Sequence, residues 1–86
     1  MTYELTFLLN EESEIANIKA LVESLGGKIT KEEKWGERTL AYSIKKNRIA
    51  TFYNYSIEIE KKQISEFKKK LNLNEKIIRY LLLILD

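Results

Sequence analysis

The sequence predicts a single α+β domain whose elements follow the order β-α-β-β-α-β. Apolar residues alternate with a period of two in four separate segments, which is typical of strands with one buried side. Two further segments repeat apolar residues at helical spacing, one after the first strand and one after the third. Because 86 residues suffice for only one hydrophobic core, the domain is expected to span residues 1–86.

This element order is that of the ferredoxin-like fold, a four-stranded antiparallel sheet with two helices on one face. The first strand is predicted over residues 3–9, where every second side chain faces a core. Asn10 or Ser13 is suited to cap the following helix, whose apolar positions recur over residues 15–25. Gly26 and the glycine after it are expected to end that helix, because glycine readily adopts the conformation needed at a helix C-terminus.

The rest of the chain predicts two long strands, the second helix and a final strand. The second strand is expected over residues 28–44, with a bulge or bend at Gly36. After a basic hairpin, residues 51–59 alternate again and are rich in strand-forming residues. Apolar residues spaced over 64–71 predict the second helix, and residues 77–85 predict the last strand. In this topology the long second strand should lie at an edge of the sheet.

The composition excludes several kinds of chemistry. The sequence has no cysteine and no histidine, which excludes disulfides, thiolate or imidazole metal sites, and nucleophiles of the cysteine–histidine type. The net charge of +2 says little about a partner, although the charges are unevenly distributed. The longest apolar run, residues 80–85, is too short to span a membrane, and no signal-peptide pattern is present, so a cytoplasmic location is expected.

Two segments of the sequence resemble a known family. Residues 36–45 follow the pattern G-x-R-x-L-A-Y-x-I-K directly after Trp35. Residues 71–80 read L-N-L-N-E-K-I-I-R-Y, at the exit of the second predicted helix and the start of the last strand. Both segments are similar to the bacterial small-subunit ribosomal protein six family, and the similarity extends over essentially the whole chain.

The resemblance implies a structural role in the ribosome. A member of this family is a component of the small ribosomal subunit, located in the cytoplasm. It binds the central domain of the small-subunit rRNA as a heterodimer with the eighteenth protein of the same subunit. The resemblance also implies no enzyme activity, no cofactor, no metal ion, no small-molecule substrate and no membrane.

The candidate RNA contacts are basic residues on the second strand, its hairpin and the start of the last strand: Arg38, Lys45, Lys46, Arg48, Lys76 and Arg79. Arginine guanidinium groups bind phosphate oxygens in a bidentate manner, and lysine ammonium groups act as point charges. The alternative is that these residues are solvated charges of a turn and of an exposed strand end. The lysines at 68–70 are better explained as cations that complement the dipole of the second helix.

The candidate contacts to a protein partner are Trp35, Leu8, Tyr80 and Leu82. The last strand is apolar on both faces, yet helices cover only one face of this fold, so an apolar surface should remain for a partner. Trp35, beside a glycine, is better explained as a packing or partner contact than as a stacking platform for a base. A dimer of the chain with itself would satisfy the same pattern.

Three other functions remain as alternatives. An RNA-recognition-motif domain needs stacking aromatics on its third strand, but residues 48–55 lack the required glycine and first aromatic, and only Phe52 would point outward. An acylphosphatase-like enzyme needs a phosphate-binding loop after the first strand, where residues 9–13 instead carry carboxylates. A domain that binds a small ligand at a sheet interface has no glycine-rich turn or polar cluster to support it.

Overall fold

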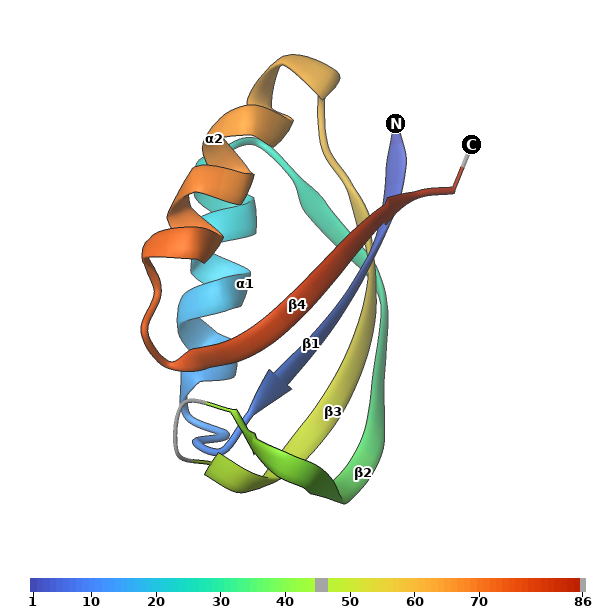
Figure 1. Cartoon of the computed structure of the whole chain (residues 1–86). Coiled ribbons are helices and arrows are strands. Elements are labelled where there is room, and N and C mark those ends of the chain that lie inside the picture. Colours follow the sequence, from blue (N-terminus) through green and yellow to red (C-terminus); the bar gives the residue numbers. More distant parts are fainter. Residues whose placement is uncertain (45–46, 86) are drawn as a thin grey trace.

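The computed structural model describes residues 1–44 and 47–85, with the backbone alone at 41–44 and 47. The elements follow in the predicted order: β1 (Thr2–Leu9), α1 (Glu14–Ser24), β2 (Lys28–Ile44), β3 (Asn47–Glu58), α2 (Lys61–Leu73) and β4 (Ile77–Ile84) (Figure 1). Strand β3 starts four residues earlier than its alternating pattern predicts, so Asn47 and Arg48 belong to a strand and not to a turn.

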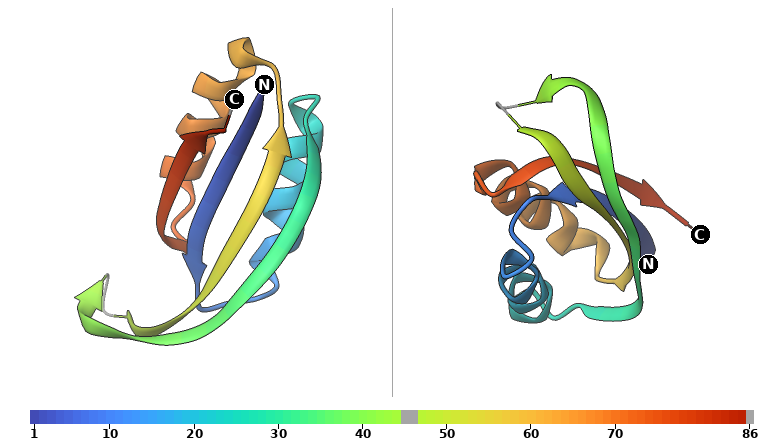
Figure 2. Two further views of the ribbon diagram at one scale, coloured as in Figure 1. Left: turned by 90° about the vertical axis from the view of Figure 1, so that its right-hand side faces the viewer. Right: turned by 90° about the horizontal axis from the view of Figure 1, so that it is seen from below.

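The sheet confirms the predicted fold class. Its strand order is β2-β3-β1-β4, and every neighbouring pair is antiparallel. Both helices lie on the same side of the sheet, which leaves the other side open (Figure 2). Strand β2 lies at one edge, as predicted, and β4 lies at the other.

Helix α1 ends as its glycines predict but does not begin with a side-chain cap. Ser13 occupies the N-cap position without a capping hydrogen bond from its side chain. At the other end Gly26 adopts a φ of 77°, and its N–H donates to the Glu23 carbonyl at 3.0 Å. The Gly27 N–H donates to the Val22 carbonyl at 2.8 Å, which completes a Schellman motif.

The main core fills the space between the sheet and the helices. Phe7 of β1 is fully buried there, and its ring stacks on Tyr53 with centroids 5.3 Å apart. The ring of Tyr55 meets Phe7 edge-on at 5.1 Å. Helix α2 contributes Phe67 and Leu71, and both are buried. These contacts explain why period-two residues of β1 and β3 and helically spaced residues of α2 are apolar.

A second, smaller cluster lies on the open side of the sheet, near the β2–β3 hairpin. It consists of the buried residues Leu8, Ala50 and Ile78, against which Leu40 and Phe52 pack. The hairpin bends past the lower end of β1 towards the side of β4 (Figure 2), and β2 carries a bulge where Gly36 has a φ of 100°. A long hairpin can therefore cover apolar residues that no helix reaches.

Candidate functional site

One end of the molecule brings together three segments that are distant in sequence. The β2–β3 hairpin, the β1–α1 connection and the α2–β4 connection all lie at the lower end in Figure 1. The predicted RNA-contacting residues Arg38, Arg48 and Arg79 belong to the strands that form this end, and all three are exposed. The predicted contacts Lys45 and Lys46 lie outside the described residues. The fold thus brings to one end of the molecule arginines that lie up to 41 positions apart in the sequence, from Arg38 to Arg79.

The arginines at this end have no acidic partner among the described residues. None of the ion pairs between described residues includes a guanidinium of Arg38, Arg48 or Arg79. Arg38 Nη1 donates only to a backbone oxygen, the Glu37 carbonyl, at 3.1 Å. An added Cβ at Gly36 would lie 3.3 Å from the same nitrogen, so the glycine leaves room for this side chain. Exposed guanidinium groups without acidic partners are suited to bind phosphate oxygens.

A bulge in β4 explains how a charged residue is accommodated in an apolar strand. In the β1–β4 pairing, Arg79 lies opposite Leu8, and the register shifts between Leu8 and Leu9. The shift leaves Ile78 as the extra residue, and Ile78 is buried in the second cluster. Arg79 stays exposed to solvent, so its guanidinium carries no burial penalty. The sequence pattern predicted the strand but not the bulge.

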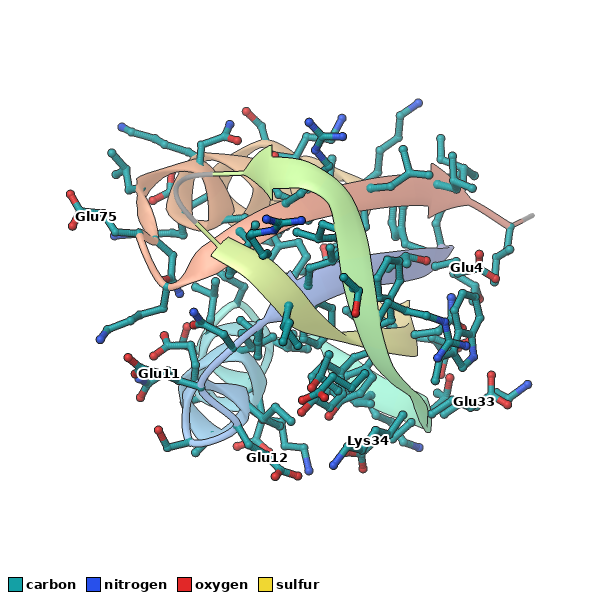
Figure 3. All side chains as sticks on the ribbon, turned by 60° about the horizontal axis from the view of Figure 1, so that its bottom comes forward. Glu4, Glu11, Glu12, Glu33, Lys34 and Glu75 are labelled. Atoms are coloured by element: carbon teal, nitrogen blue, oxygen red, sulfur yellow. The ribbon has the colours of Figure 1, made fainter. Side chains whose placement is uncertain are left out.

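Lys76 differs from the three arginines, because its ammonium is paired with an acid. Its Nζ donates to Glu11 Oε1 at 3.0 Å, and this hydrogen bond is the main reason that the pKa of Lys76 is raised. Glu11, Glu12 and Glu75 lie on the same side of this end of the molecule (Figure 3). Lys76 therefore has an acidic partner, whereas the three arginines have none among the described residues.

The predicted partner residues lie in three different environments. Trp35 is at the bulge of β2 and is 47% exposed. Leu8 is buried in the second cluster. Tyr80 and Leu82 lie opposite Phe7 and Leu5, so they face the helices and pack against the main core. Their role in binding a partner stays a prediction.

The exposed apolar side of β4 consists of residues of its other face, which were not among the predicted partner contacts. Because side chains alternate along a strand, Leu81 and Leu83 face the open side, where they are 56% and 46% exposed. Period-two alternation defines two faces but does not tell which one the helices cover. The register of β4 against β1 distinguishes the two faces, because it pairs Tyr80 with the buried Phe7.

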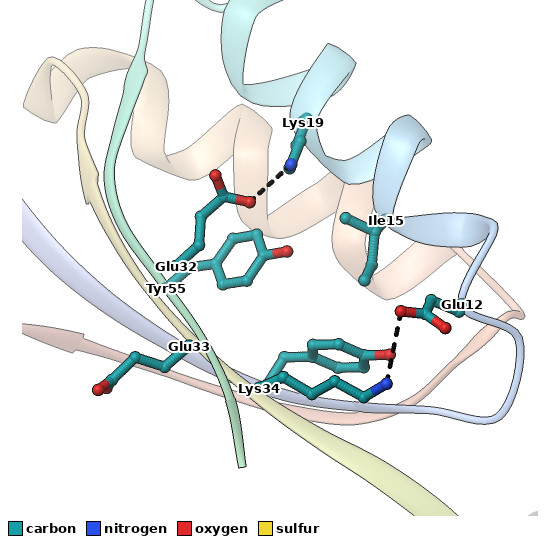
Figure 4. Close-up of a pocket in the computed structure, with 8 residues that line it drawn as sticks. Glu12, Ile15, Lys19, Glu32, Glu33, Lys34 and Tyr55 are labelled. Atoms are coloured by element: carbon teal, nitrogen blue, oxygen red, sulfur yellow. Dashed lines mark hydrogen bonds and ion pairs between the residues drawn. The ribbon is translucent and has the colours of Figure 1, made fainter. Parts of the chain in front are cut away.

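A cleft of about 400 Å³ lies between α1 and β2 (Figure 4). Two ion pairs close over it, Lys19 Nζ to Glu32 Oε1 at 2.6 Å and Lys34 Nζ to Glu12 Oε1 at 3.5 Å. Tyr53 and Tyr55 also line the cleft, and Figure 4 labels Tyr55. Burial is the main cause that raises the pKa of both phenols, and the Glu32 carboxylate helps to raise the pKa of Tyr55 to about 12. The charges of this cleft are paired within the chain.

The raised phenol pKa predicts a loss of stability in strong alkali. The folded state favours the neutral phenol of Tyr55, because the pKa of this group is raised in the fold. The contribution of the phenol to the free energy of unfolding is therefore complete below the ordinary pKa of 10.0 and is lost as the pH rises towards about 12. A rise of this size corresponds to roughly 3 kcal/mol in the free energy of unfolding. Urea unfolding at several pH values should show a shallower decline for Tyr55→Phe than for the wild type. An identical decline in both proteins would contradict this role of Tyr55.

Two other kinds of site find no support in the part of the chain that the structure describes. Neither helix among residues 1–44 and 47–85 is long and apolar enough to cross a membrane. Over the same residues, no group of three or more acidic side chains is arranged to hold a metal ion.

Comparison with known proteins gives one consistent family. The family model described as Ribosomal protein S6 matches residues 2–83. The small ribosomal subunit protein bS6 of Afipia carboxidovorans is 37% identical over 91 residues, which cover 98% of this chain and 63% of that protein. The bS6 protein of a Methylobacterium species is also 37% identical, with 98% and 68% of the two chains covered. The chain thus spans about two thirds of the length of these relatives.

A solved structure agrees with the sequence comparisons. The crystal structure of 30S ribosomal protein S6 from Thermotoga maritima matches with a TM-score of 0.80 and 26% sequence identity. The match covers 94% of this chain and 83% of the Thermotoga protein.

Proposed function

Because the chain belongs to the ribosomal protein S6 family, we propose that it acts as a structural component of the small ribosomal subunit. The family consists of ribosomal proteins and not of enzymes, in agreement with the prediction from sequence. The proposed activity is binding to the central domain of the small-subunit rRNA, together with the eighteenth protein of the same subunit.

The observation that carries the RNA part of the proposal is the group of unpaired arginines at one end of the molecule. Arg38, Arg48 and Arg79 are exposed and make no ion pair with another described residue. Lys45 and Lys46 follow Arg38 on the same hairpin in the sequence and add to the basic character of the segment. Such groups bind an RNA backbone by releasing condensed counterions.

The proposed protein partner is the eighteenth protein of the small subunit, bound as a heterodimer. Leu81 and Leu83 support this, because two adjacent large apolar side chains on an open sheet face are suited to an interface. Trp35 is a third exposed apolar residue and is a candidate for the same interface. Tyr80 and Leu82 would act from beneath, by supporting the strand that carries the exposed leucines, and Leu8 would act on the open side through the second cluster.

An RNA-recognition-motif mechanism is less well supported by the packing of the open face. That mechanism requires aromatic rings that are available to stack on bases. Phe52, the one candidate from the sequence, is partly buried and packs against the cluster of Leu8, Ala50 and Ile78. Its ring therefore serves the fold of the hairpin.

The proposal is tested by protection of a central-domain rRNA fragment from chemical cleavage. The chain and the eighteenth protein together are expected to protect a defined part of the fragment, and either protein alone should protect it less. Replacing both Leu81 and Leu83 with serine should weaken the joint protection without unfolding the chain, because both side chains are largely exposed. The absence of protection under every condition would refute the proposal.

A further inference from the structure

The α2–β4 connection holds Lys76 in a built position. The Asn74 side chain accepts the Lys76 N–H through Oδ1 at 2.8 Å and donates through Nδ2 to Glu14 Oε1 at 2.9 Å. Glu14 is only 8% exposed, and its second carboxylate oxygen accepts a hydrogen bond from Asn17 at 3.1 Å. The backbone of Lys76 is thereby tied to the first turn of α1, next to the loop that carries Glu11.

This position places the ammonium of Lys76 against an acid on the surface of the molecule. Its Nζ lies 3.0 Å from Glu11 Oε1, and the two side chains are each about half exposed. Glu12 and Glu75 lie on the same side of the molecule (Figure 3). Only three positions further along the chain, Arg79 is exposed without an ion pair to any other described residue. The two cations, close in sequence, thus differ in their pairing: Lys76 has an acidic partner, and Arg79 has none among the described residues.

We propose that Glu11 is a specificity-determining residue, which masks Lys76 and confines RNA to the arginine-bearing part of this end. The inference rests on the proposed function, because it concerns the limits of the RNA-binding surface. Phosphate contacts carry no sequence information, so an additional accessible lysine would favour all RNA molecules alike. Lys76, while it is paired with Glu11, still supports the α2–β4 connection but is less available for contacts with unrelated RNA.

Removing the mask should extend the RNA-binding surface by one cation. In Glu11→Gln the flexible stem of Lys76 would allow its ammonium to reach a phosphate. Affinity for an unrelated RNA duplex should rise about threefold, and the logarithmic dependence of affinity on salt should become steeper by about 0.7 to 0.9, the value for one phosphate contact. Affinity for the central-domain fragment should rise no more than this, so the preference for that fragment should not improve.

The matched control is Glu60→Gln. Glu60 pairs with Lys62 at 3.3 Å at the start of α2, at the opposite end of the molecule (Figure 1). This substitution removes the same negative charge and the same kind of exposed ion pair, but it releases a lysine far from the arginines. Lys76→Gln and the double variant Glu11→Gln/Lys76→Gln complete the set, and thermal melting checks that each variant folds.

Each outcome of this experiment decides the inference. It predicts that affinity for the unrelated RNA rises in Glu11→Gln and does not rise in Glu60→Gln. The double variant should lose this rise, and Lys76→Gln alone should change the affinity little. An equal gain for the two glutamate variants would show a net-charge effect and overturn the mask, and so would no gain for Glu11→Gln. Weaker binding by Lys76→Gln alone would show that Lys76 already contacts RNA. If the wild type binds neither RNA, the proposed function itself fails.

Discussion

Replacing Arg38, Arg48 and Arg79 together with glutamine is expected to weaken binding to the central-domain rRNA fragment by about 100-fold or more. A hydrogen bond to a charged group contributes roughly 1.5–3 kcal/mol, and 1.4 kcal/mol corresponds to a factor of ten. Even the lower value, lost at only two of the three positions, accounts for the expected change. The three side chains are exposed, so the fold should be unaffected.

The control for this variant must remove the same charge elsewhere. Lys28, Lys61 and Lys62 are exposed and lie where β2 and α2 begin, at the opposite end of the molecule (Figure 1). Their joint replacement with glutamine should change the affinity by no more than a few-fold, through the general field of the protein. Equal losses in the two triple variants would mean that the arginines have no special position in the interface.

Replacing Phe7 with alanine is expected to cost about 3–5 kcal/mol in the free energy of unfolding. Phe7 is fully buried at the centre of β1 and contacts the rings of both Tyr53 and Tyr55. A domain of this length has a total stability of roughly 4–13 kcal/mol, so one substitution removes much of it. Urea unfolding should show a lower midpoint with an unchanged slope.

The control for Phe7→Ala is Leu83→Ala on the open side of β4. Leu83 is 46% exposed, and its truncation should change the free energy of unfolding by less than about 0.5 kcal/mol. If the two variants lost similar stability, the packing of β1 against the helices would not be the main core. A loss below about 1 kcal/mol for Phe7→Ala would contradict it as well.

The fold could be predicted because each element carries a local pattern. Tyr3, Leu5, Phe7 and Leu9 alternate along β1, and all four are buried on the side of the helices. The position of Gly36 predicted the irregularity of β2, and there Gly36 adopts a positive φ, which glycine reaches more easily than other residues. Such signals need no knowledge of what lies opposite a residue.

The parts that could not be predicted depend on pairing between distant segments. The bulge at Ile78 arises from the register of β4 against β1, and this register also decides that Tyr80 faces the helices while Leu81 faces outward. Similarly, Lys76 pairs with Glu11 across 65 positions. For this reason a lysine only three positions before Arg79 differs from it in charge environment. The sequence indicated which residues are basic, and the fold decides which of them remain available.

The dependence of RNA affinity on salt is the measurement that tests the central claim most directly. With the eighteenth protein present, the wild-type chain should bind the central-domain fragment with an affinity that falls steeply as salt is added. The plot of log affinity against log salt concentration should have a slope of about −2 or steeper, because three arginine–phosphate contacts would each contribute about −0.7 to −0.9. The arginine triple variant should lose most of this slope, and the lysine control should retain it. A wild-type affinity that does not change with salt, or a slope that survives in the arginine variant, would contradict the account.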